Sequence, residues 1–495
     1  MSDSAVVPDF AEFARLAAPG RIVPVAIEIP FDLDTPVTAF SKLRRGPFAF
    51  LLESVEGGER WARFSFLGSS PREAWRLDGA EIRHWTPDGG WSDAEPTEDP
   101  FGAFEAWITR HEPVDLPHLP RFWGGAVGFF GYDTVRWLER LPHAPPDDLG
   151  VPDACFMATE HVLIIDNLFS RAFAVAAVPV PDEAADLESL YEGACDRLAE
   201  WIRGLERPHD LRSLGRGAGD PTEVSGNRSR DDYEAAVDRI REYIVAGDAY
   251  QVVVSQRAGA RFGGDPLELY RALRRSNPSP YLFFIELDGV RLIGSSPETL
   301  VRVEDGSVTV RPIAGTRPRG ASLEEDEEHA AELLADEKER AEHLMLVDLG
   351  RNDVGRVASP GSVRVARFME IERYSHVMHL VSEVTGSIRP GVDAVEAFEA
   401  CFPAGTLTGA PKVRAMEIID ELEPTRRGPY GGAAGYVGYG ATSLDMAIVI
   451  RTLLSVGDRV YAQAGAGIVY DSVPTREWEE TRHKARVLLE ALAEV

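Results

Sequence analysis

The stretch Gly124-Gly125-Ala126-Val127-Gly128-Phe129-Phe130-Gly131-Tyr132 occurs a second time, as Gly431-Gly432-Ala433-Ala434-Gly435-Tyr436-Val437-Gly438-Tyr439, with six identities in nine positions. A shorter pair, Leu67 to Pro71 and Ile293 to Pro297, repeats in the same order. Glycines inside strands are typical of bulges or of close backbone approach. The repeats therefore predict a duplicated, strand-rich unit.

The two halves differ just after the shorter repeat, where Glu298 follows the second copy and Arg72 follows the first. Only the second half thus presents a carboxylate at that position. Between the halves, residues 206–230 are rich in proline and glycine and poor in apolar residues, as is typical of a linker. We therefore expect an N-terminal domain over residues 1–205, this linker, and a second domain over residues 231–495.

The stretch from Ala464 to Thr481 contains the first candidate site. Residues 460–463 are expected to form a strand. Gly465 and Gly467 follow, and without side chains they let an anion approach backbone N–H groups closely. Pro474 is expected to open a helix. The pattern predicts an anion-binding segment between a strand and a helix.

Two expected helices each carry a pair of carboxylates. Glu477 and Glu480 are three residues apart, as are Glu339 and Glu342 in the expected helix over residues 336–349, so each pair shares one helix face. Two such helices could meet at one divalent cation, and oxygen-only ligands suggest Mg²⁺. Each could equally be an ordinary acidic helix of an acidic chain.

The chain is strongly acidic, with 52 Lys and Arg against 81 Asp and Glu and a formal net charge of −29 over 495 residues. This balance argues against nucleic acid and anionic membranes as partners. No apolar run is long enough for a membrane span, and the N-terminus lacks the pattern of a signal peptide. The three cysteines have no metal-ligand spacing and suggest reduced thiols. We therefore expect a cytoplasmic protein.

Three other motifs are weak when taken alone. The stretch Gly405 to Lys412 lacks the Gly-Lys-Ser/Thr ending of a phosphate loop. The motif at Gly465 lacks the third glycine and the acidic partner of a dinucleotide site. His379 lies in an expected strand over residues 374–382, on the face opposite its apolar neighbours. A lone histidine in such a place is more often structural than catalytic.

Several separate motifs match one family. They are Leu51-Leu52-Glu53-Ser54, Asn277-Pro278-Ser279-Pro280-Tyr281, Pro312-Ile313-Ala314-Gly315-Thr316, Asp348-Leu349-Gly350-Arg351-Asn352-Asp353, Gly405 to Lys412, and Gly465 to Thr481. Through them the chain resembles the chorismate-utilising enzymes from about Leu51 to Lys484, and most closely their anthranilate synthase component I branch.

The resemblance implies an α+β fold, with large antiparallel sheets in a duplicated, sandwich-like core and helices outside. It implies conversion of chorismate and ammonia to anthranilate and pyruvate, the first step of tryptophan biosynthesis, with Mg²⁺ as the cofactor and feedback inhibition by tryptophan. Ammonia would come from a separate glutamine amidotransferase subunit. The chain ends at Val495, and its cysteines lack the histidine and carboxylate pattern that such chemistry needs.

The resemblance also assigns roles to residues. Mg²⁺ would be held by Glu342 and Glu480, supported by Glu339 and Glu477. Substrate would be held by Gly315, Thr316, Tyr430, Arg451, Lys484 and the amides of Gly465, Ala466 and Gly467. Glu298 would protonate the leaving hydroxyl, His379 would act as base or electrostatic helper, and Thr406 would orient the nucleophile. Tryptophan would bind at Glu53, Ser54, Asn277, Pro280, Tyr281 and Leu282.

Two positions distinguish the members of this family. Isochorismate and salicylate synthases have a lysine at the position of Gln251, where it activates water. Common aminodeoxychorismate synthases have a nucleophilic lysine at the position of Ala314. Because neither lysine is present, the sequence favours ammonia addition at C2 of chorismate. The nearest alternative is aminodeoxychorismate synthase component I, and an alternative of another class is a non-catalytic tryptophan-sensing module.

Overall fold

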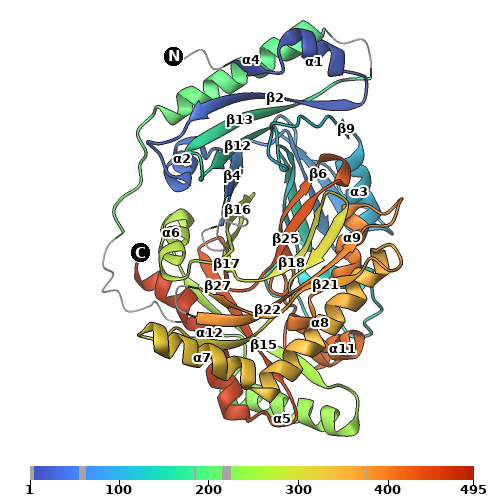
Figure 1. Cartoon of the computed structure of the whole chain (residues 1–495), viewed down its shortest axis with the longest axis vertical. Coiled ribbons are helices and arrows are strands. Elements are labelled where there is room, and N and C mark those ends of the chain that lie inside the picture. The colour runs from blue at the N-terminus through green and yellow to red at the C-terminus, as the bar shows by residue number, and fades with distance from the viewer. Residues whose placement is uncertain (1–4, 55–62, 183–185, 215–223, 375–376) are drawn as a thin grey trace.

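The computed structural model describes residues 5–54, 63–182, 186–214, 224–374 and 377–495. Two large sheets form the centre of the molecule, and helices pack along their outer sides (Figure 1). Within the described residues, every strand pair is antiparallel except the short parallel contact between β2 and β9. This confirms the expected α+β architecture.

The first sheet has the strand order β1 (Val6–Val7), β2 (Arg21–Pro30), β13 (Arg171–Pro179), β12 (His161–Asp166), β4 (Phe64–Ser69), β3 (Phe48–Glu53), β16 (Tyr281–Leu287), β17 (Val290–Ser296), β26 (Thr452–Val456), β27 (Arg459–Ile468), β15 (Gln251–Arg261) and β14 (Ser225–Gly226), with β9 (Glu112–Pro113) beside β2 and β23 (Gly409–Ala410) beside β15. The second has the order β20 (Ile313–Pro318), β22 (Val377–Ser387), β19 (Ser307–Val310), β18 (Thr299–Glu304), β25 (Leu444–Ile448), β24 (Ala433–Gly438), β10 (Gly125–Phe130), β11 (Ala154–Ala158), β5 (Glu73–Asp78), β6 (Glu81–Thr86) and β7 (Gly90–Trp91), with β21 (Arg364–Arg373) beside β22 and β8 (Glu95–Pro96) beside β6.

Both sheets show the predicted duplication in their strand order. Outward from the centre of the first sheet, β3, β4, β12, β13 and β2 follow on one side, and β16, β17, β26, β27 and β15 follow on the other. In the second sheet, β10, β11, β5 and β6 are mirrored by β24, β25, β18 and β19. Matched strands occur in the same order along the chain, so each half contributes one copy of the same unit.

The repeated glycine stretch lies at the centre of this symmetry, because its two copies pair with each other. β10 and β24 are antiparallel neighbours in which Gly128 lies opposite Gly435. A Cβ atom on Gly128 would lie 2.0 Å from the carbonyl oxygen of Cys155, and one on Gly435 would lie 2.1 Å from that of Asp445. Any side chain at either position would collide with a neighbouring strand, which explains why glycine is repeated there.

Residues before and after the expected linker share both sheets and one large apolar core between them. Within residues 206–230, Ser225 and Gly226 form β14 at the edge of the first sheet. The helices are α1 (Phe10–Leu16), α2 (Pro36–Leu43), α3 (Pro100–Thr109), α4 (Leu187–Leu205), α5 (Arg230–Ala246), α6 (Pro266–Ser276), α7 (Leu323–Ala335), α8 (Glu337–Val357), α9 (Ala394–Cys401), α10 (Gly405–Thr408), α11 (Lys412–Leu422) and α12 (Pro474–Ala493). In the described part of the chain, none of them is both long enough and apolar enough to span a bilayer.

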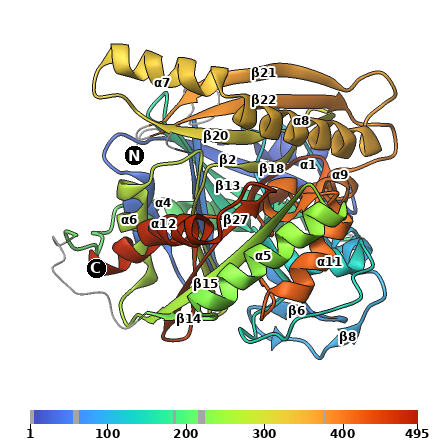
Figure 2. The ribbon, with the colours of Figure 1, turned by 90° about the horizontal axis from the view of Figure 1, so that it is seen from below.

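Three expected elements continue beyond their expected ends, among them the strand expected over residues 374–382, since β22 continues to Ser387. The helix expected over residues 336–349 continues through Val357, because Gly350 lies on its packed face, where an added Cβ would lie 3.0 Å from Val310 Cγ2. Gly350 therefore permits close packing and does not end the helix. The strand expected over residues 460–463 continues to Ile468. Figure 2 shows the end of the molecule where α5, α11, α12 and β15 gather.

Candidate active site

Glu298 lies in the turn between β17 and β18 and is paired with Thr406 of α10. Thr406 Oγ1 donates a hydrogen bond to Glu298 Oε2 at 2.9 Å. Burial raises the pKa of Glu298 to about 7, although the Thr406 hydrogen bond and the charges of Lys484 and Arg451 act in the opposite direction. A carboxyl group with this pKa can hold a proton at neutral pH and give it up readily.

Gly465 and Gly467 lie inside β27, opposite Ser255 and Val253 of β15. The backbone N–H of Ser255 donates to Glu423 Oε1 at 2.7 Å, so it does not bond to Gly465. Along an antiparallel pair, the backbone groups of successive residues point alternately toward and away from the partner strand. The N–H and C=O groups of Gly465 and Gly467 therefore point away from β15, and those of Ala466 point toward β15. The pairing with β26 has ended before these glycines, so their amides face an open edge.

This geometry corrects the expectation that Ala466 contributes its amide to the substrate. Ala466 lies opposite Val254 and is fully buried. Because the alternation places its N–H in the ladder with β15, the open edge offers the amides of Gly465 and Gly467 only. The sequence motif could not separate these three amides, because the strand was expected to end at residue 463, before the glycines, so no alternation was expected there.

Tyr430 and Lys484 line the open edge of β27. A Cβ added to Gly465 would lie 2.9 Å from the Tyr430 hydroxyl oxygen, and Lys484 Nζ donates a hydrogen bond to the carbonyl oxygen of Gly465 at 2.9 Å. Burial raises the pKa of Tyr430, which therefore remains a neutral phenol. A carboxylate placed along this edge would meet an ammonium group and a backbone N–H.

Arg451 adds a second cation close to Glu298 and Tyr430. Burial lowers the pKa of the Arg451 guanidinium, and the charges of those two neighbours act against that shift. The backbone of Arg451 is left-handed, with φ of 50°, which is uncommon for a residue with a side chain. Its carbonyl oxygen accepts a hydrogen bond from Ser295 N–H at 3.1 Å, which helps to hold this conformation.

His379 lies on β22 beside Gly315 and Thr316 of β20. Its Nδ1 lies 2.9 Å from the carbonyl oxygen of Gly315 and 3.1 Å from Thr316 Oγ1. Because a carbonyl oxygen can only accept, we infer that Nδ1 carries the proton, which leaves Nε2 as an acceptor. Burial lowers the pKa of His379, so the ring is neutral at pH 7. The expected strand around it also included residues 375–376, which lie outside the described residues.

The carboxylates of α8 and α12 influence one another. Burial raises the pKa of Glu342, and the charges of Glu339 and Glu480 raise it further. A hydrogen bond from Gln251 Nε2 to Glu342 Oε1, at 3.1 Å, acts in the opposite direction. Burial raises the pKa of Glu477, and the charge of Glu480 adds to it. Like charges brought this close are a reason for a cation to bind here.

The same carboxylates already have partners within the protein. Lys484 Nζ lies 2.7 Å from Glu480 Oε1, and Arg317 Nη1 lies 3.4 Å from Glu339 Oε1. In the described part of the chain, no three acidic, histidine or cysteine side chains are close enough to form a ready metal centre. The donor set consists of oxygen atoms and fits Mg²⁺ in kind, provided that Glu480 exchanges Lys484 for the metal.

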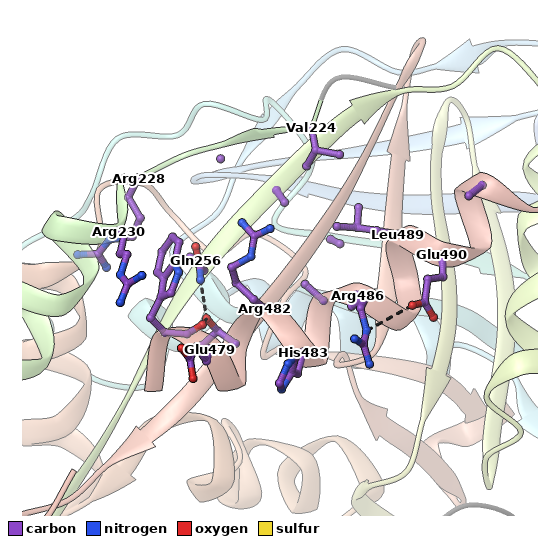
Figure 3. A pocket seen from close by; sticks show the side chains of 17 residues that line it. Val224, Arg228, Arg230, Gln256, Glu479, Arg482, His483, Arg486, Leu489 and Glu490 are labelled. Carbon is purple, nitrogen blue, oxygen red and sulfur yellow. Dashed lines mark hydrogen bonds and ion pairs between the residues drawn. The ribbon is translucent and has the colours of Figure 1, made fainter. Parts of the chain in front are cut away.

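The cavities around the site are modest. One of about 420 Å³ lies at its mouth and is lined by Arg451, Arg476, Glu479, Glu480, His483 and Lys484. Another of about 50 Å³ lies behind Glu298 and Thr406. A larger cavity of about 820 Å³ lies between another face of α12 and β14–β15 (Figure 3), with Arg228, Gln256 and Arg482 among its lining residues. None of the predicted catalytic, substrate or metal residues lines the larger cavity, which therefore lies apart from the predicted site.

The residues predicted to bind tryptophan lie around a separate pocket of about 520 Å³ between the two sheets. Leu52, Glu53, Ser54, Pro280, Tyr281 and Leu282 line it, together with the rings of Phe66 and Tyr436, whereas Asn277 is not among its lining residues. Asn277 instead donates from Nδ2 to Ser295 Oγ at 3.0 Å. The pocket is large enough for an amino acid with an indole ring.

The Glu53 carboxylate has protein partners on both oxygens. Arg274 donates to them at 3.0 and 3.1 Å, and the hydroxyl of Tyr270 also donates to Glu53. Tyr281 connects this pocket to the turn that carries Glu298, because its hydroxyl lies 2.9 Å from Oγ1 of Thr299, the residue that follows Glu298. A ligand that moves Tyr281 would therefore disturb the turn that carries Glu298.

Sequence reasoning missed three charged residues near the site. Arg317 lies on β20 and pairs with Glu339. Glu423 and Arg427 form a buried ion pair behind β15. Their spacing of four residues is the one signal in the sequence, but it is equally common on exposed helix surfaces, so it could not have identified a buried pair.

Comparisons with known proteins identify the family of the chain. Residues 80–490 match the family model of chorismate binding enzymes. Anthranilate synthase component 1 of Pseudomonas putida is 50% identical over 97% of this chain and 98% of its own length. The protein of the same name from Aquifex aeolicus is 46% identical, with 97% of each chain covered.

Solved structures show the same relation. The crystal structure of anthranilate synthase component I from Streptococcus pneumoniae matches with a TM-score of 0.75 and 36% identity, covering 93% of this chain and 99% of that one. A menaquinone-specific isochorismate synthase from Escherichia coli has the same fold, with a TM-score of 0.70, 98% of each chain covered and 19% identity. With a matching family model over most of its length and relatives at this identity, the chain belongs to the chorismate binding enzymes.

Proposed function

We propose that this protein is anthranilate synthase component I, which converts chorismate and ammonia to anthranilate, pyruvate and water. The observation that carries the proposal is the placement of a carboxyl group with a pKa near 7, Glu298, close to the two cations Arg451 and Lys484. A dianionic substrate with a hydroxyl leaving group needs both features. The identity to relatives named anthranilate synthase component 1 supports this choice among the reactions of the family.

Substrate binding relies on the open edge of β27. Arg451, Lys484 and the Gly467 amide offer complementary charge and N–H groups to the enolpyruvyl carboxylate, and Tyr430 can donate a hydrogen bond from its neutral hydroxyl. Gly315 and Thr316 would face the ring from β20. Held in this way, the C4 hydroxyl of chorismate would face Glu298.

The chemistry proposed for the protein has two stages. In the first, ammonia attacks C2 of chorismate while the C4 hydroxyl leaves as water with the proton from Glu298, and the ammonium group formed at C2 then gives up one proton, which restores the acid form of Glu298. Thr406 would keep the carboxyl group of Glu298 oriented for this transfer. In the second, His379 Nε2 takes the C2 proton as the C3–O bond breaks, and the enolpyruvate that leaves gains a proton at its methylene carbon to become pyruvate. The ring becomes aromatic in this step, which drives the elimination.

The proposed cofactor is Mg²⁺, which Glu342 and Glu480 would hold and Glu339 and Glu477 would support. When bound, it would neutralise the ring carboxylate of chorismate. Gln251 would orient Glu342 through the hydrogen bond between their side chains. An amide cannot act as the base for attacking water, and Ala314 has no nucleophile. Both residues therefore support ammonia as the nucleophile.

The second candidate function is that of aminodeoxychorismate synthase component I, which adds nitrogen but retains the enolpyruvyl group. His379 argues against it, because the geometry leaves Nε2 free to remove the C2 proton. Product analysis separates the two reactions. Anthranilate is fluorescent and appears with one equivalent of pyruvate, whereas aminodeoxychorismate formation releases no pyruvate.

We further propose that tryptophan binds in the pocket between the sheets and inhibits the enzyme. The support is the pocket's size, its aromatic lining by Phe66 and Tyr436, and the hydrogen bond between the hydroxyl groups of Tyr281 and Thr299, the residue after Glu298. Because coupling between two sites is reciprocal, chorismate and tryptophan should each weaken the binding of the other. Isothermal titration of tryptophan with and without chorismate tests this directly.

Glutamine would be hydrolysed by a separate amidotransferase subunit. Such a reaction needs a nucleophilic thiolate. All three cysteines of the sequence, Cys155, Cys195 and Cys401, have pKa values raised by burial, so none is such a thiolate. The name of the relatives, component 1, is in keeping with a partner component. The test is whether the pure chain uses ammonium salts but not glutamine.

A further inference from the structure

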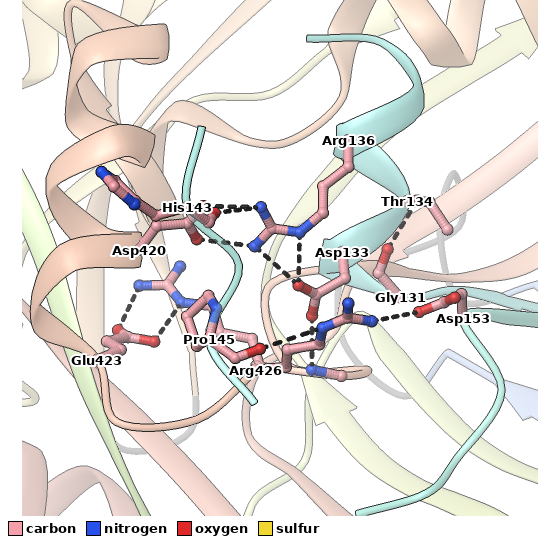
Figure 4. Close-up of polar contacts among 12 residues, drawn as sticks. Gly131, Asp133, Thr134, Arg136, His143, Pro145, Asp153, Asp420, Glu423 and Arg426 are labelled. Atoms are coloured by element: carbon pink, nitrogen blue, oxygen red, sulfur yellow. Dashed lines mark hydrogen bonds and ion pairs between the residues drawn. The ribbon is translucent and has the colours of Figure 1, made fainter. Parts of the chain in front are cut away.

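Glu423 and Arg427 form an ion pair whose side chains are only 3% and 1% exposed. The pair is bidentate, with Arg427 Nε 2.9 Å from Glu423 Oε2 and Nη2 2.7 Å from Oε1. It lies just beyond the end of α11, in the region that Figure 4 shows, where Glu423 is labelled.

The remaining donors of Arg427 reach two segments that carry active-site residues. Nη1 donates to the carbonyl oxygen of Leu407 at 2.6 Å, and Leu407 directly follows Thr406 in α10. Nη2 donates to the carbonyl oxygen of Val253 at 2.9 Å. Val253 lies on β15 opposite Gly467, the glycine whose amide faces the substrate edge.

The ion pair also replaces a missing strand beside β15. The outer edge of β15 is paired with β23 at Gln251 and Val252, and with β14 at Ala258 and Gly259. Between these short strands, the Val253 carbonyl is bonded to Arg427 and the Ser255 N–H to Glu423. Two charged side chains thus complete the backbone hydrogen bonding of β15, the strand that supports the open edge of β27.

Aromatic contacts extend the role of Arg427. Its guanidinium carbon lies 4.6 Å from the ring centre of Tyr132 and 5.7 Å from that of Tyr430. Tyr430 lines the substrate edge. Tyr132 begins the 3-10 helix Tyr132–Trp137 of the first half, in which Arg136 bonds to Asp420 of α11 at 2.7 and 2.8 Å (Figure 4).

Stability of the fold alone does not explain why this ion pair is buried. Removing two charges from water costs desolvation energy, and their mutual attraction often does no more than offset that cost, so a buried ion pair adds little to the free energy of unfolding. Here every hydrogen bond of the Arg427 guanidinium outside the pair goes to a segment of the active site. Taking the proposed reaction as given, we propose that Arg427 is a positioning residue. It holds the Thr406 turn against Glu298, and it holds β15 in place behind the open edge of β27.

The test is a mutant cycle between Arg427→Lys and Thr406→Ala. Lysine keeps the charge but cannot donate to Glu423, Leu407 and Val253 with one planar group. The Thr406 hydrogen bond lowers the pKa of Glu298. Loss of this hydrogen bond should therefore move the alkaline limb of the pH–rate profile to higher pH. Arg427→Lys should lower kcat about 10-fold or more with a smaller change in KM, and should move the limb in the same direction.

The double variant should show no further shift of the limb, because both changes remove the same hydrogen bond. Arg426→Lys is the matched control, since the Arg426 side chain bonds to the Pro145 carbonyl and lies 3.9 Å from Asp153 (Figure 4). A normal pH profile in Arg427→Lys, or shifts that add in the double variant, would overturn the proposal.

Amide hydrogen exchange gives a second measurement that does not depend on activity. Arg427→Lys should speed exchange at residues 407–409 and 253–255 and leave distant strands unchanged, whereas Arg426→Lys should not. If Arg427→Lys fails to fold, Glu423→Gln, which preserves shape, takes its place. Absence of anthranilate formation by the wild-type protein would reject the proposed function, while unchanged exchange in a folded Arg427→Lys protein would reject positioning by Arg427.

Discussion

Gln251 donates a hydrogen bond from Nε2 to Oε1 of Glu342, at a distance of 3.1 Å. This contact joins β15, the strand behind the open edge of β27, to α8, the helix that carries the proposed metal ligands Glu339 and Glu342. A Cβ on Gly467 would lie only 2.4 Å from Gln251 Nε2, so the missing side chain leaves room for the amide. The residue proposed to favour ammonia over water as nucleophile therefore lies against the carboxylate proposed to bind Mg²⁺.

Replacing Gln251 by lysine should impair the reaction through the metal site. The ammonium group of Gln251→Lys would pair with Glu342 and compete with Mg²⁺ for that carboxylate. We expect the Mg²⁺ concentration that gives half-maximal activity to rise about 10-fold or more, as for other groups that orient metal ligands. Gln256→Lys, on the same strand but in the larger cavity beside α12, is the control. An unchanged Mg²⁺ requirement would contradict the placement of Gln251.

The metal assignment predicts that Glu342→Gln and Glu480→Gln abolish activity with little loss of thermal stability. Glu342 has a pKa raised by burial and by neighbouring carboxylates, so neutralising it relieves repulsion in the free protein. Glu479→Gln, one residue from Glu480 on α12, should retain activity. Anthranilate formation and thermal unfolding, measured with and without Mg²⁺, test this. Near wild-type turnover by either of the first two variants would disprove the assignment.

Glu298 predicts how activity depends on pH. As the proposed general acid it must be protonated, so kcat/KM for chorismate should fall as pH rises through about 7, the pKa to which burial raises this group. The assay must hold free ammonia constant, because ammonia itself increases with pH. Glu298→Gln should lose roughly 10²- to 10⁴-fold in rate and lack the alkaline limb. A limb near pH 7 that persists in this variant would assign it to another group.

Ser54→Phe should relieve inhibition by tryptophan and leave the ammonia-dependent rate largely intact. Ser54 lines the pocket between the sheets, and an added ring would fill the space proposed for the indole. Inhibition curves for the wild type and the variant are the measurement, and the rate without tryptophan is the internal control. Equal inhibition of both proteins would place the tryptophan site elsewhere.

The sequence was a good guide to the architecture because the glycine repeats have a steric cause. Gly128 and Gly435 pair at the centre of one sheet, where a Cβ would collide with the next strand. Gly350 shows the limit of such reasoning. Its packed position inside α8, not a helix end, depends on Val310, a contact that local sequence does not report.

The sequence motifs predicted Glu298 and Thr406 as separate site residues, and the hydrogen bond between them emerged only from the structure. The sequence did not predict which backbone N–H groups face the site, because the direction of the Ala466 N–H depends on the pairing of β27 with β15. Buried supports such as Arg427 were missed because their partners are carbonyl oxygens far away in sequence. Sequence patterns report residue type and spacing, whereas these features arise from long-range packing.

The most direct test of the proposed function uses the pure chain with chorismate, Mg²⁺ and a nitrogen source, and quantifies both products. With ammonium salts, the account predicts anthranilate and pyruvate in equal amounts, with a rate that follows the concentration of free ammonia. With glutamine in place of ammonium, it predicts neither product. An amino product without pyruvate, or glutamine-dependent anthranilate from the pure chain, would contradict it.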